Sequence, residues 1–528
     1  MTDRSTMTAV AASARYHRGQ PLGAPALHAA AQVTSSKVIR HEKHLPPTMH
    51  PDEHARSARV NSMRGCRLVL TIMVLALAGC MAPHALPLAR THSASTAVPD
   101  DGTAAKEGPI VVLVTLDGLP ARALRDPRLP MPTLHRLEAE GAHADAMRPI
   151  NPTITWPNHT TLITGVNASV HDVMANGLIV LPADGGKIEV KPWTDKDRLV
   201  HAQTLYDALA AKGMSTGQVD WVAIYDARNV RWPFAELPDP DGAIARDLEA
   251  QGLVTREQLA SFDSSPAWRD EIWTDAAVDI LTHHTPNLLL VHLLQTDTLQ
   301  HDYGALSSAA YAAYAYADTC LARLVAAARK AGILDRVTFI IASDHGFADY
   351  THAIRPNAAL VQLGLLHQQH GDYRGKVWVL PEGGEASLFI RDVPHRTALV
   401  ARLQNYFATV PGIAHVYTNR EAQSLGIPAS GSTDQAPDLY LAAKPGYAFV
   451  WGITGPVVRP KIPAHGAHGY LNTDPDMQAI FVASGAHIRR GIDLGTISNL
   501  SVAPTLAKLL GVSLPAAMHP PLTQALQP

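Results

Sequence analysis

The sequence predicts an α/β fold: a mainly parallel central sheet flanked by helices, with a smaller cap or subdomain beside it. Two observations predict it. Apolar, β-branched runs typical of buried parallel strands alternate with helical segments along most of the chain. One long stretch, about 348–462, is rich in Pro and Gly and breaks that alternation, so it is expected to form the added subdomain.

The first elements follow from residue pattern and stop signals. "PIVVLVTL" (Pro109–Leu116) is almost wholly apolar, as expected for a strand buried on both faces. "MPTLHRLEAEG" predicts a short helix that stops at Gly141, and "TLYDALAAKG" predicts another that ends at Gly213.

The second half repeats the alternation. "NLLLVHLL" (287–294) and "RVTFIIAS" (336–343) predict strands on either side of an Ala-rich helix from about Ser307 to Ala331. "MQAIFVASG" (477–485) predicts a further strand and "SVAPTLAKLLG" a last helix. The folded domain is therefore expected to span residues 109–515, followed by a C-terminal tail at 516–528.

Bulk composition limits the classes of function. The 528 residues carry a formal net charge of −3, which gives no reason to expect a nucleic-acid partner. Three cysteines are too few for a disulfide framework. The length suits one large domain with accessory segments.

The segment 63–80 is predicted to be a lipoprotein signal peptide. Arg64 and Arg67 precede an apolar run, 68–78, that is too short to span a bilayer. The run ends in "LAGC", which resembles a bacterial lipobox and predicts cleavage before Cys80 and lipidation of its thiol. A simple cleaved signal and a chance match to the lipobox are the alternatives.

The flanks of this signal are not expected to fold. Residues 1–62 show no sustained period and are expected to be disordered or to lie upstream of the true start at Met63. Residues 81–108 are expected to form a flexible linker. Met81, in place of Asp after the lipobox, resembles outer-membrane lipoproteins, so the expected location is periplasmic, anchored to the outer membrane.

Acidic and imidazole side chains gather where the predicted strands end or begin. In open α/β sheets ligands bind at the carboxyl ends of the strands, so these residues are expected to converge. Three carboxylates with three imidazoles suit zinc-like divalent ions, and six ligands exceed the three that one catalytic ion needs, which favours two ions. The residues are Asp117, Asp297, His301, Asp344, His345 and His468.

A threonine hydroxyl is predicted at the start of a helix within "NPTITWPNHTTLITG" (151–165). Pro157 suits the first turn of a helix, and Thr155 would lie near its N-cap, where free N–H groups favour a phosphate. A metal-bound hydroxyl there would be an activated nucleophile. Taken alone, Thr155 could simply cap the helix.

Together these motifs resemble the nucleotide pyrophosphatase/phosphodiesterase family of the alkaline phosphatase superfamily. The resemblance covers about residues 109–515 and implies an alkaline phosphatase-like sandwich with two zinc ions. The motifs that carry it are "LDG" (116–118), "PTITWPNHTTLITG" (152–165), "DTLQHDYG" (297–304), "SDHG" (343–346) and "GAHGYLN" (466–472).

The resemblance also implies individual roles. One zinc would be held by Asp297, His301 and His468. The other would be held by Asp117, Asp344, His345 and the nucleophile Thr155. The family places its nucleophile directly before an aromatic-Pro-Asn-His sequence, which selects Thr155 over Thr153.

Two further residues are expected to contact substrate. Asn176 matches the asparagine that holds a phosphate oxygen in the family. Trp156, where the family usually has Phe, would stack on a base or cover an acyl or aryl group; the alternative is that it only fills apolar space. The expected activity is hydrolysis of a small phosphodiester or nucleotide through a phosphothreonine on Thr155. Phosphonate or phosphomonoester hydrolysis at the same site, and a non-catalytic envelope lipoprotein, are the alternatives.

Overall fold

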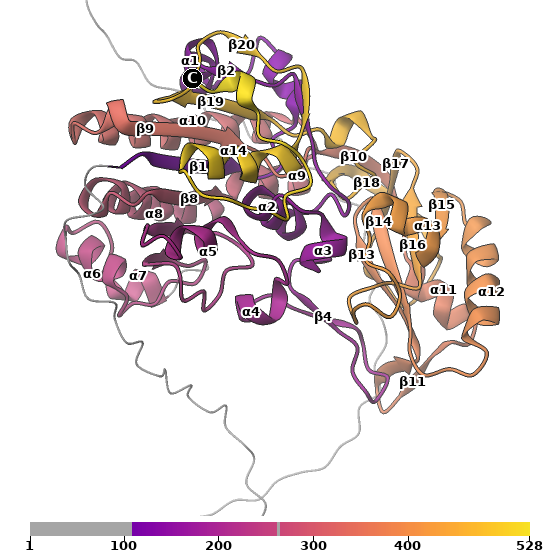
Figure 1. The fold of residues 1–528 in the computed structure, drawn as a ribbon. Helices are drawn as coiled ribbons and strands as arrows, with labels where there is room; N and C mark the ends of the chain where they lie inside the picture. Colours follow the sequence, from indigo (N-terminus) through magenta and orange to yellow (C-terminus); the bar gives the residue numbers. More distant parts are fainter. Residues whose placement is uncertain (1–107, 261–264) are drawn as a thin grey trace, which may run out of the picture. The chain divides into compact units, whose positions relative to one another are not determined.

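The computed structural model describes residues 108–260 and 265–528, and every structural statement below refers to them (Figure 1). The predicted signal peptide, the lipidation site Cys80 and nearly all of the predicted linker lie outside the described residues. Within these two ranges no helix is both long enough and apolar enough to cross a membrane.

The centre of the fold is a mixed, mainly parallel sheet of eight strands. β9, β1, β8, β6 and β7 run parallel to one another, whereas β19 runs antiparallel to both β9 and β2. The predicted fold class is confirmed. In sheet order the strands are β20 (Ile492–Asp493), β2 (Ala142–His143), β19 (Phe481–Gly485), β9 (Val337–Ala342), β1 (Ile110–Leu116), β8 (Leu288–Leu293), β6 (Thr216–Val219) and β7 (Trp232–Phe234).

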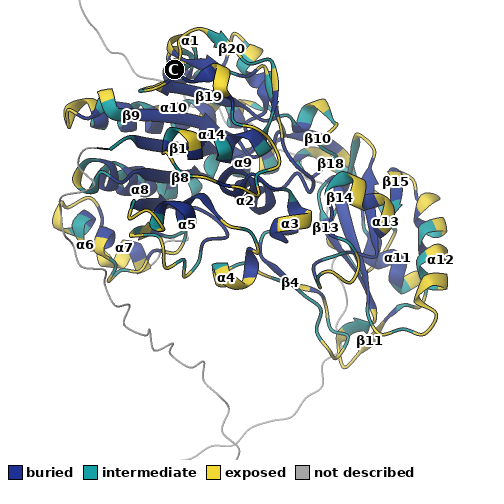
Figure 2. Ribbon diagram, in the orientation of Figure 1, coloured by how far each residue is buried: buried dark blue, intermediate teal, exposed yellow. Residues whose placement is uncertain are grey.

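Helices cover both faces of this sheet, and the side chains of β1 show why. Alternate residues of a strand point to opposite faces, so Val112 and Val114 join one apolar cluster while Val111 and Leu113 join another. The first cluster packs under α1 (Pro132–Glu140), α6 (Ala243–Ala250), α7 (Arg256–Ala260), α8 (Pro266–Asp279) and α10 (Ser308–Lys330). The second packs under α2 (Thr155–Thr164), α5 (Leu205–Ala210) and α14 (Val502–Leu509). Figure 2 shows the buried strands between these two helical layers.

Most predicted elements appear within one or two residues of their expected bounds. The exception is the predicted strand at 477–485, which begins only at Phe481. The preceding residues form a short turn, Pro475–Met477, and Ala479 makes isolated bridges with Pro120 and Met147. Those bridges divert the chain from the sheet until Phe481.

Residues 348–467 form a second apolar core beside the main sheet. The segment is more regular than its Pro and Gly content suggested. Two of its prolines, Pro460 and Pro463, lie in β18, which pairs with β10 alone at the edge of its sheet, where a missing N–H is tolerated.

The elements of this region make three sheets with short helices between them (Figure 1). One sheet contains β17 (Gly446–Phe449), β10 (Ala348–Ile354) and β18 (Val458–Ala467). The second contains β13 (Val377–Glu382), β14 (Glu385–Ile390), β16 (Leu439–Ala443) and β15 (Ile413–Thr418), and the third is the hairpin β11 (Leu366–Gln369) and β12 (Asp372–Gly375). The helices are α11 (Pro356–Gln362), α12 (Arg396–Ala408) and α13 (Asn419–Ala422).

Short elements near the main sheet complete the described chain. They are β3 (Ala146–Arg148), which pairs with β21 (Thr496–Ser498), the hairpin β4 (Leu178–Val180) and β5 (Glu189–Lys191), α3 (Ala168–His171), α4 (Lys196–Leu199) and α9 (Gln295–Tyr303).

Candidate active site

The first cluster of predicted ligands lies at the carboxyl ends of two neighbouring strands. Asp117 follows β1, and Asp344 and His345 follow β9, so the parallel pairing brings them to one edge of the sheet. His345 Nε2 lies 3.4 Å from Asp117 Oδ1 and 3.1 Å from Asp344 Oδ2. All three side chains are fully buried.

The second cluster combines α9 with the end of β18. Asp297 and His301 lie one turn apart on α9, with His301 Nε2 at 3.4 Å from Asp297 Oδ2. His468, directly after β18, places its Nε2 atom 3.7 Å from Asp297 Oδ1. The rings of His468 and His345 stack with their centroids 3.8 Å apart, so the two clusters adjoin.

Each of the three histidines uses its other ring nitrogen on a backbone carbonyl. Nδ1 of His301, His345 and His468 lies 3.1–3.2 Å from the carbonyl oxygens of Gly466, Gly346 and Thr153, respectively. A carbonyl only accepts, so each Nδ1 carries the proton. In a neutral ring this tautomer leaves the lone pair on Nε2, the atom that faces the carboxylates, as a metal ligand needs.

Each carboxylate in the clusters has one oxygen that lacks a donor. Asp117 Oδ1, Asp297 Oδ1 and Asp344 Oδ2 are buried without a hydrogen-bond partner. Burial, together with the charges of Asp344 and Asp297, raises the pKa of Asp117 well above its usual value. Buried, unpaired acceptor oxygens beside imidazole lone pairs fit divalent cations.

Thr155 is the hydroxyl that faces these clusters. It is the first residue of α2, which ends at Gly165 in the left-handed region, and its Oγ1 lies 3.4 Å from His345 Nε2. The Thr153 hydroxyl instead donates to the Tyr470 carbonyl.

The residues after Thr155 hold its backbone in place. The side-chain amide of Asn158 donates to the carbonyls of Pro152 and Ile154, and its oxygen accepts from the N–H of Ile150. The loop before α2 is therefore fixed from within, which accounts for an asparagine at this position of the motif.

Comparison with known proteins gives a decisive match. A family model described as type I phosphodiesterase / nucleotide pyrophosphatase matches residues 111–471, a span that contains all six predicted ligands and Thr155. The chain belongs to this family.

Individual relatives of this phosphodiesterase-family chain are distant. Ectonucleotide pyrophosphatase/phosphodiesterase family member 3 of Bos taurus is 21% identical over 76% of this chain and 42% of its own length. An uncharacterized pyrophosphatase/phosphodiesterase of Schizosaccharomyces pombe is 25% identical over 76% of each chain. The chain thus spans about two fifths of the first curated relatives it matches.

Solved structures of the family share the fold. Human ectonucleotide pyrophosphatase/phosphodiesterase 5 has a TM-score of 0.59 at 19% identity, covering 78% of this chain and 96% of its own. An inactive murine form of the same protein, solved in complex with AMP, has a TM-score of 0.58 at 19% identity, covering 77% of this chain and 96% of its own. These matches confirm the predicted fold.

A cavity of about 310 Å³ opens over the family's motif residues in this chain. Thr155, Asp297, His301 and His468 line it together with Trp193, Val222 and Glu236. Trp193, which is about half exposed, was missed in the sequence; a tryptophan in the polar stretch "KPWTDKD" was the available signal.

The two predicted substrate contacts lie at this cavity but differ in exposure. Trp156 lines it yet is only 5% exposed, because its ring packs against Val173 and Val222 in a small apolar cluster. Asn176 Oδ1 accepts from the Trp156 N–H at 3.0 Å, which leaves the amide nitrogen of Asn176 as its donor.

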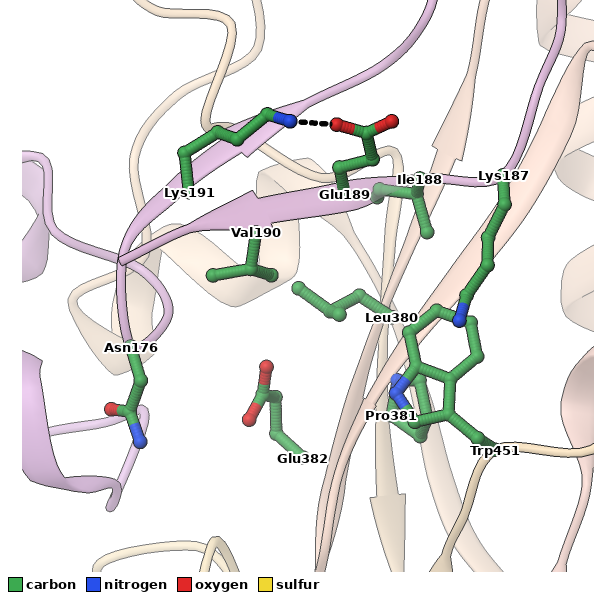
Figure 3. A pocket seen from close by; sticks show the side chains of 10 residues that line it. All are labelled: Asn176, Lys187, Ile188, Glu189, Val190, Lys191, Leu380, Pro381, Glu382 and Trp451. Atoms are coloured by element: carbon green, nitrogen blue, oxygen red, sulfur yellow. Dashed lines mark ion pairs between the residues drawn. The ribbon is translucent and has the colours of Figure 1, made fainter. Parts of the chain in front are cut away.

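A second cavity, of about 470 Å³, begins at Asn176 and runs between the β4–β5 hairpin and β13 (Figure 3). The carboxyl group of Glu382 points into it, and burial raises the pKa of Glu382 to about 8. Lys187 Nζ lies 4.2 Å from the ring centre of Trp451 at its rim.

The sequence analysis also missed a buried histidine behind the first cluster. His292 on β8 pairs in register with Thr115 of β1, and its ring bridges two carboxylates. Its Nε2 lies 2.9 Å from Asp117 Oδ2 and its Nδ1 lies 2.9 Å from Asp220 Oδ2. A lone histidine within the apolar run "LLLVHLL" was the signal, because a buried imidazole needs partners.

Proposed function

We propose that the chain hydrolyses phosphodiester or phosphoanhydride bonds, with Thr155 as nucleophile and two divalent ions, zinc by the chemistry of the ligands, as cofactors. The observation that carries this proposal is the position of Thr155 Oγ1, 3.4 Å from His345 Nε2, beside two adjoining groups of imidazoles and carboxylates whose inner oxygens are unpaired.

The proposed metal ligands divide as the clusters do. Asp117, Asp344, His345 and the Thr155 hydroxyl would hold one ion, and Asp297, His301 and His468 the other. When bound, such ions favour the deprotonated hydroxyl and neutralise charge on the phosphoryl group.

The chain's own groups perform the displacement. Thr155 Oγ attacks phosphorus, a new P–O bond forms, and the bond to the leaving group breaks with its electron pair on the departing oxygen. Water then attacks the phosphothreonine, which releases the phosphorylated product and restores the hydroxyl. The Asn176 amide nitrogen would donate to a phosphoryl oxygen, and the N-terminal end of α2 would favour the same negative charge; the bond from the Trp156 N–H to Asn176 Oδ1 supports this role.

Two cavities that meet at Asn176 favour a diester over a monoester. A diester carries a substituent on each side of phosphorus, and each cavity can accept one. A neutral asparagine also suits the single charge of a diester. The activity for which the family is named and the AMP bound to the murine relative support a nucleotide as one substituent. Phosphonate or phosphomonoester hydrolysis at the same site is the second candidate.

The test compares bis(p-nitrophenyl) phosphate with p-nitrophenyl phosphate, each with zinc and then with chelator. We expect faster diester turnover that chelation abolishes; faster monoester turnover would favour the second candidate. Thr155→Ala should abolish turnover while bound metal stays near wild type. Thr164→Ala, at the far end of the same helix, is the matched control, since its hydroxyl bonds only within and just beyond α2.

No turnover of either ester by a zinc-loaded wild-type protein would support the alternative of a non-catalytic envelope lipoprotein. Location is a separate proposal: cleavage before Cys80 and acylation of its thiol would anchor the chain in the periplasm at the outer membrane. The "LAGC" sequence after a short apolar run supports it.

A further inference from the structure

A third group of carboxylate and imidazole side chains lies on the helical layer and shares no residue with the active site. Asp247 lies in α6, Asp279 is the last residue of α8, and His284 ends the π-helical turn η2 (Ile280–His284) that continues α8. One oxygen or nitrogen of each residue lies within 4.8 Å of the others.

The spacing of these atoms matches that of the active-site clusters. His284 Nε2 lies 3.5 Å from Asp247 Oδ2 and 3.8 Å from Asp279 Oδ2. Ligand atoms about 2.0–2.1 Å from a tetrahedral zinc lie about 3.4 Å from one another. The proposed catalytic ligands show separations of 3.1–3.7 Å, so the third group is comparably spread.

The two innermost atoms lack hydrogen-bond partners. Asp279 is only 2% exposed, and both its Oδ2 atom and the Nε2 atom of His284 are shielded from solvent without a hydrogen bond. Unpaired buried polar atoms are costly unless another group satisfies them. The two atoms lie 3.8 Å from each other.

Surrounding groups orient the two ligands. Asp279 Oδ1 accepts from Gln251 at 2.6 Å and from His283 Nδ1 at 2.7 Å, which leaves Oδ2 to face the group. The His284 ring stacks on Trp232 with centroids 5.1 Å apart. Such outer contacts fix the direction of metal ligands in known sites.

The π-helical turn brings Asp279 and His284 together. In a π-turn, backbone bonds join residues five apart, so side chains five apart lie over one another. Thr285 N–H bonds to the Ile280 carbonyl in this way. His283, four residues on, contacts the other oxygen of Asp279, so the π-helical turn lets both histidines reach the same carboxylate.

We propose that Asp247 Oδ2, Asp279 Oδ2 and His284 Nε2 bind a third divalent cation of the zinc class, with water in the remaining position. The Asp247 side chain is 47% exposed and gives the ion its route of entry. The ion would link α6 to the end of α8, which makes it a structural rather than a catalytic ion.

The experiment counts zinc per chain after chelation, reloading and desalting. Wild type should hold one zinc more than either Asp247→Asn or His284→Gln, and zinc should raise the Tm of wild type more than that of the variants. Diester turnover should be unchanged in both variants. His135→Gln, which removes an α1 histidine paired with Glu138 at 3.2 Å, is the matched control and should keep the wild-type count.

The readout is the difference in zinc per chain between wild type and variant, so it does not depend on metal bound at the active site. If the catalytic clusters bound no metal, wild type would hold one zinc and the variants none. Equal counts and equal zinc-dependent Tm shifts in wild type and variants would overturn the proposal and leave the group as a set of side-chain contacts that binds no ion. If His284→Gln fails to fold, the half-exposed Asp247→Asn decides.

Discussion

His292 permits a paired test of how the first cluster is held. Burial alone would lower the pKa of His292, but Asp220 and Asp117 outweigh it and raise that pKa well above its usual value. The ring lies between two carboxyl groups, one of which belongs to a proposed metal ligand. Two amide substitutions separate its two bonds, because an Asn side chain places its nitrogen near the position of Nδ1 and a Gln side chain near Nε2.

His292→Asn should keep the bond to Asp220 and lose the 2.9 Å bond to Asp117 Oδ2. A hydrogen bond to a charged group contributes about 1.5–3 kcal/mol, and about 1.4 kcal/mol is a tenfold change in affinity. Zinc binding by the Asp117, Asp344 and His345 cluster should therefore weaken about 10- to 100-fold, the range typical of lost outer contacts.

His292→Gln should do the reverse. It keeps the donor to Asp117 but leaves the buried Asp220 without its partner, so the free energy of unfolding should fall while zinc affinity changes little. The assay is zinc titration of chelator-stripped protein against a competing dye, with urea unfolding alongside. His292→Asn with both zinc affinities within twofold of wild type would refute the argument.

Three other substitutions test separate parts of the chain. Asn176→Ala should lower kcat for the diester about 10²- to 10³-fold while zinc content is kept, because the transition state loses one hydrogen-bond donor to its developing negative charge. An unchanged kcat would show that Asn176 does not contact the phosphoryl group. Because burial raises the pKa of Glu382 to about 8, the folded state loses about 1.4 kcal/mol of stability for each pH unit between the ordinary pKa of a glutamate and this raised value. In metal-free protein, the Tm of Glu382→Gln minus that of wild type should therefore be larger at pH 8.5 than at pH 5. A Tm difference that does not change with pH would contradict this. Cys80→Ser should move the protein from the membrane to the soluble fraction of the cell envelope and abolish palmitate labelling. Labelling that persists in the variant would disprove acylation of Cys80.

The positions of the ligands at strand ends could be predicted from the sequence, whereas the elements and residues that hold them in place could not. Asp117, Asp344 and His345 could be placed because each directly follows a strand whose apolar run marks its end. His468 was expected before a main-sheet strand, and its actual element, β18, was not predicted because two prolines and no alternation mark it.

Residues that connect segments far apart in the sequence could not be recognised from the local sequence pattern. His292 contacts Asp220 and Asp117 only because β8 lies between β1 and β6 in the sheet. Neither pairing follows from local pattern, since it depends on sheet order. Trp193 and Glu382 reach the cavities from a loop and from the second core, and only the folded chain brings them to Asn176.

His468 comes from a different part of the fold than the other five proposed metal ligands. Three of the six proposed ligands follow main-sheet strands and two lie on α9, which follows β8. His468 instead comes directly after β18, whose last residue, Ala467, packs in the second apolar core. An ion held by Asp297, His301 and His468 would therefore link the main-sheet core to the second apolar core. The loaded protein should then melt in one cooperative step, and stripping the ion should let the region of residues 348–467 loosen first.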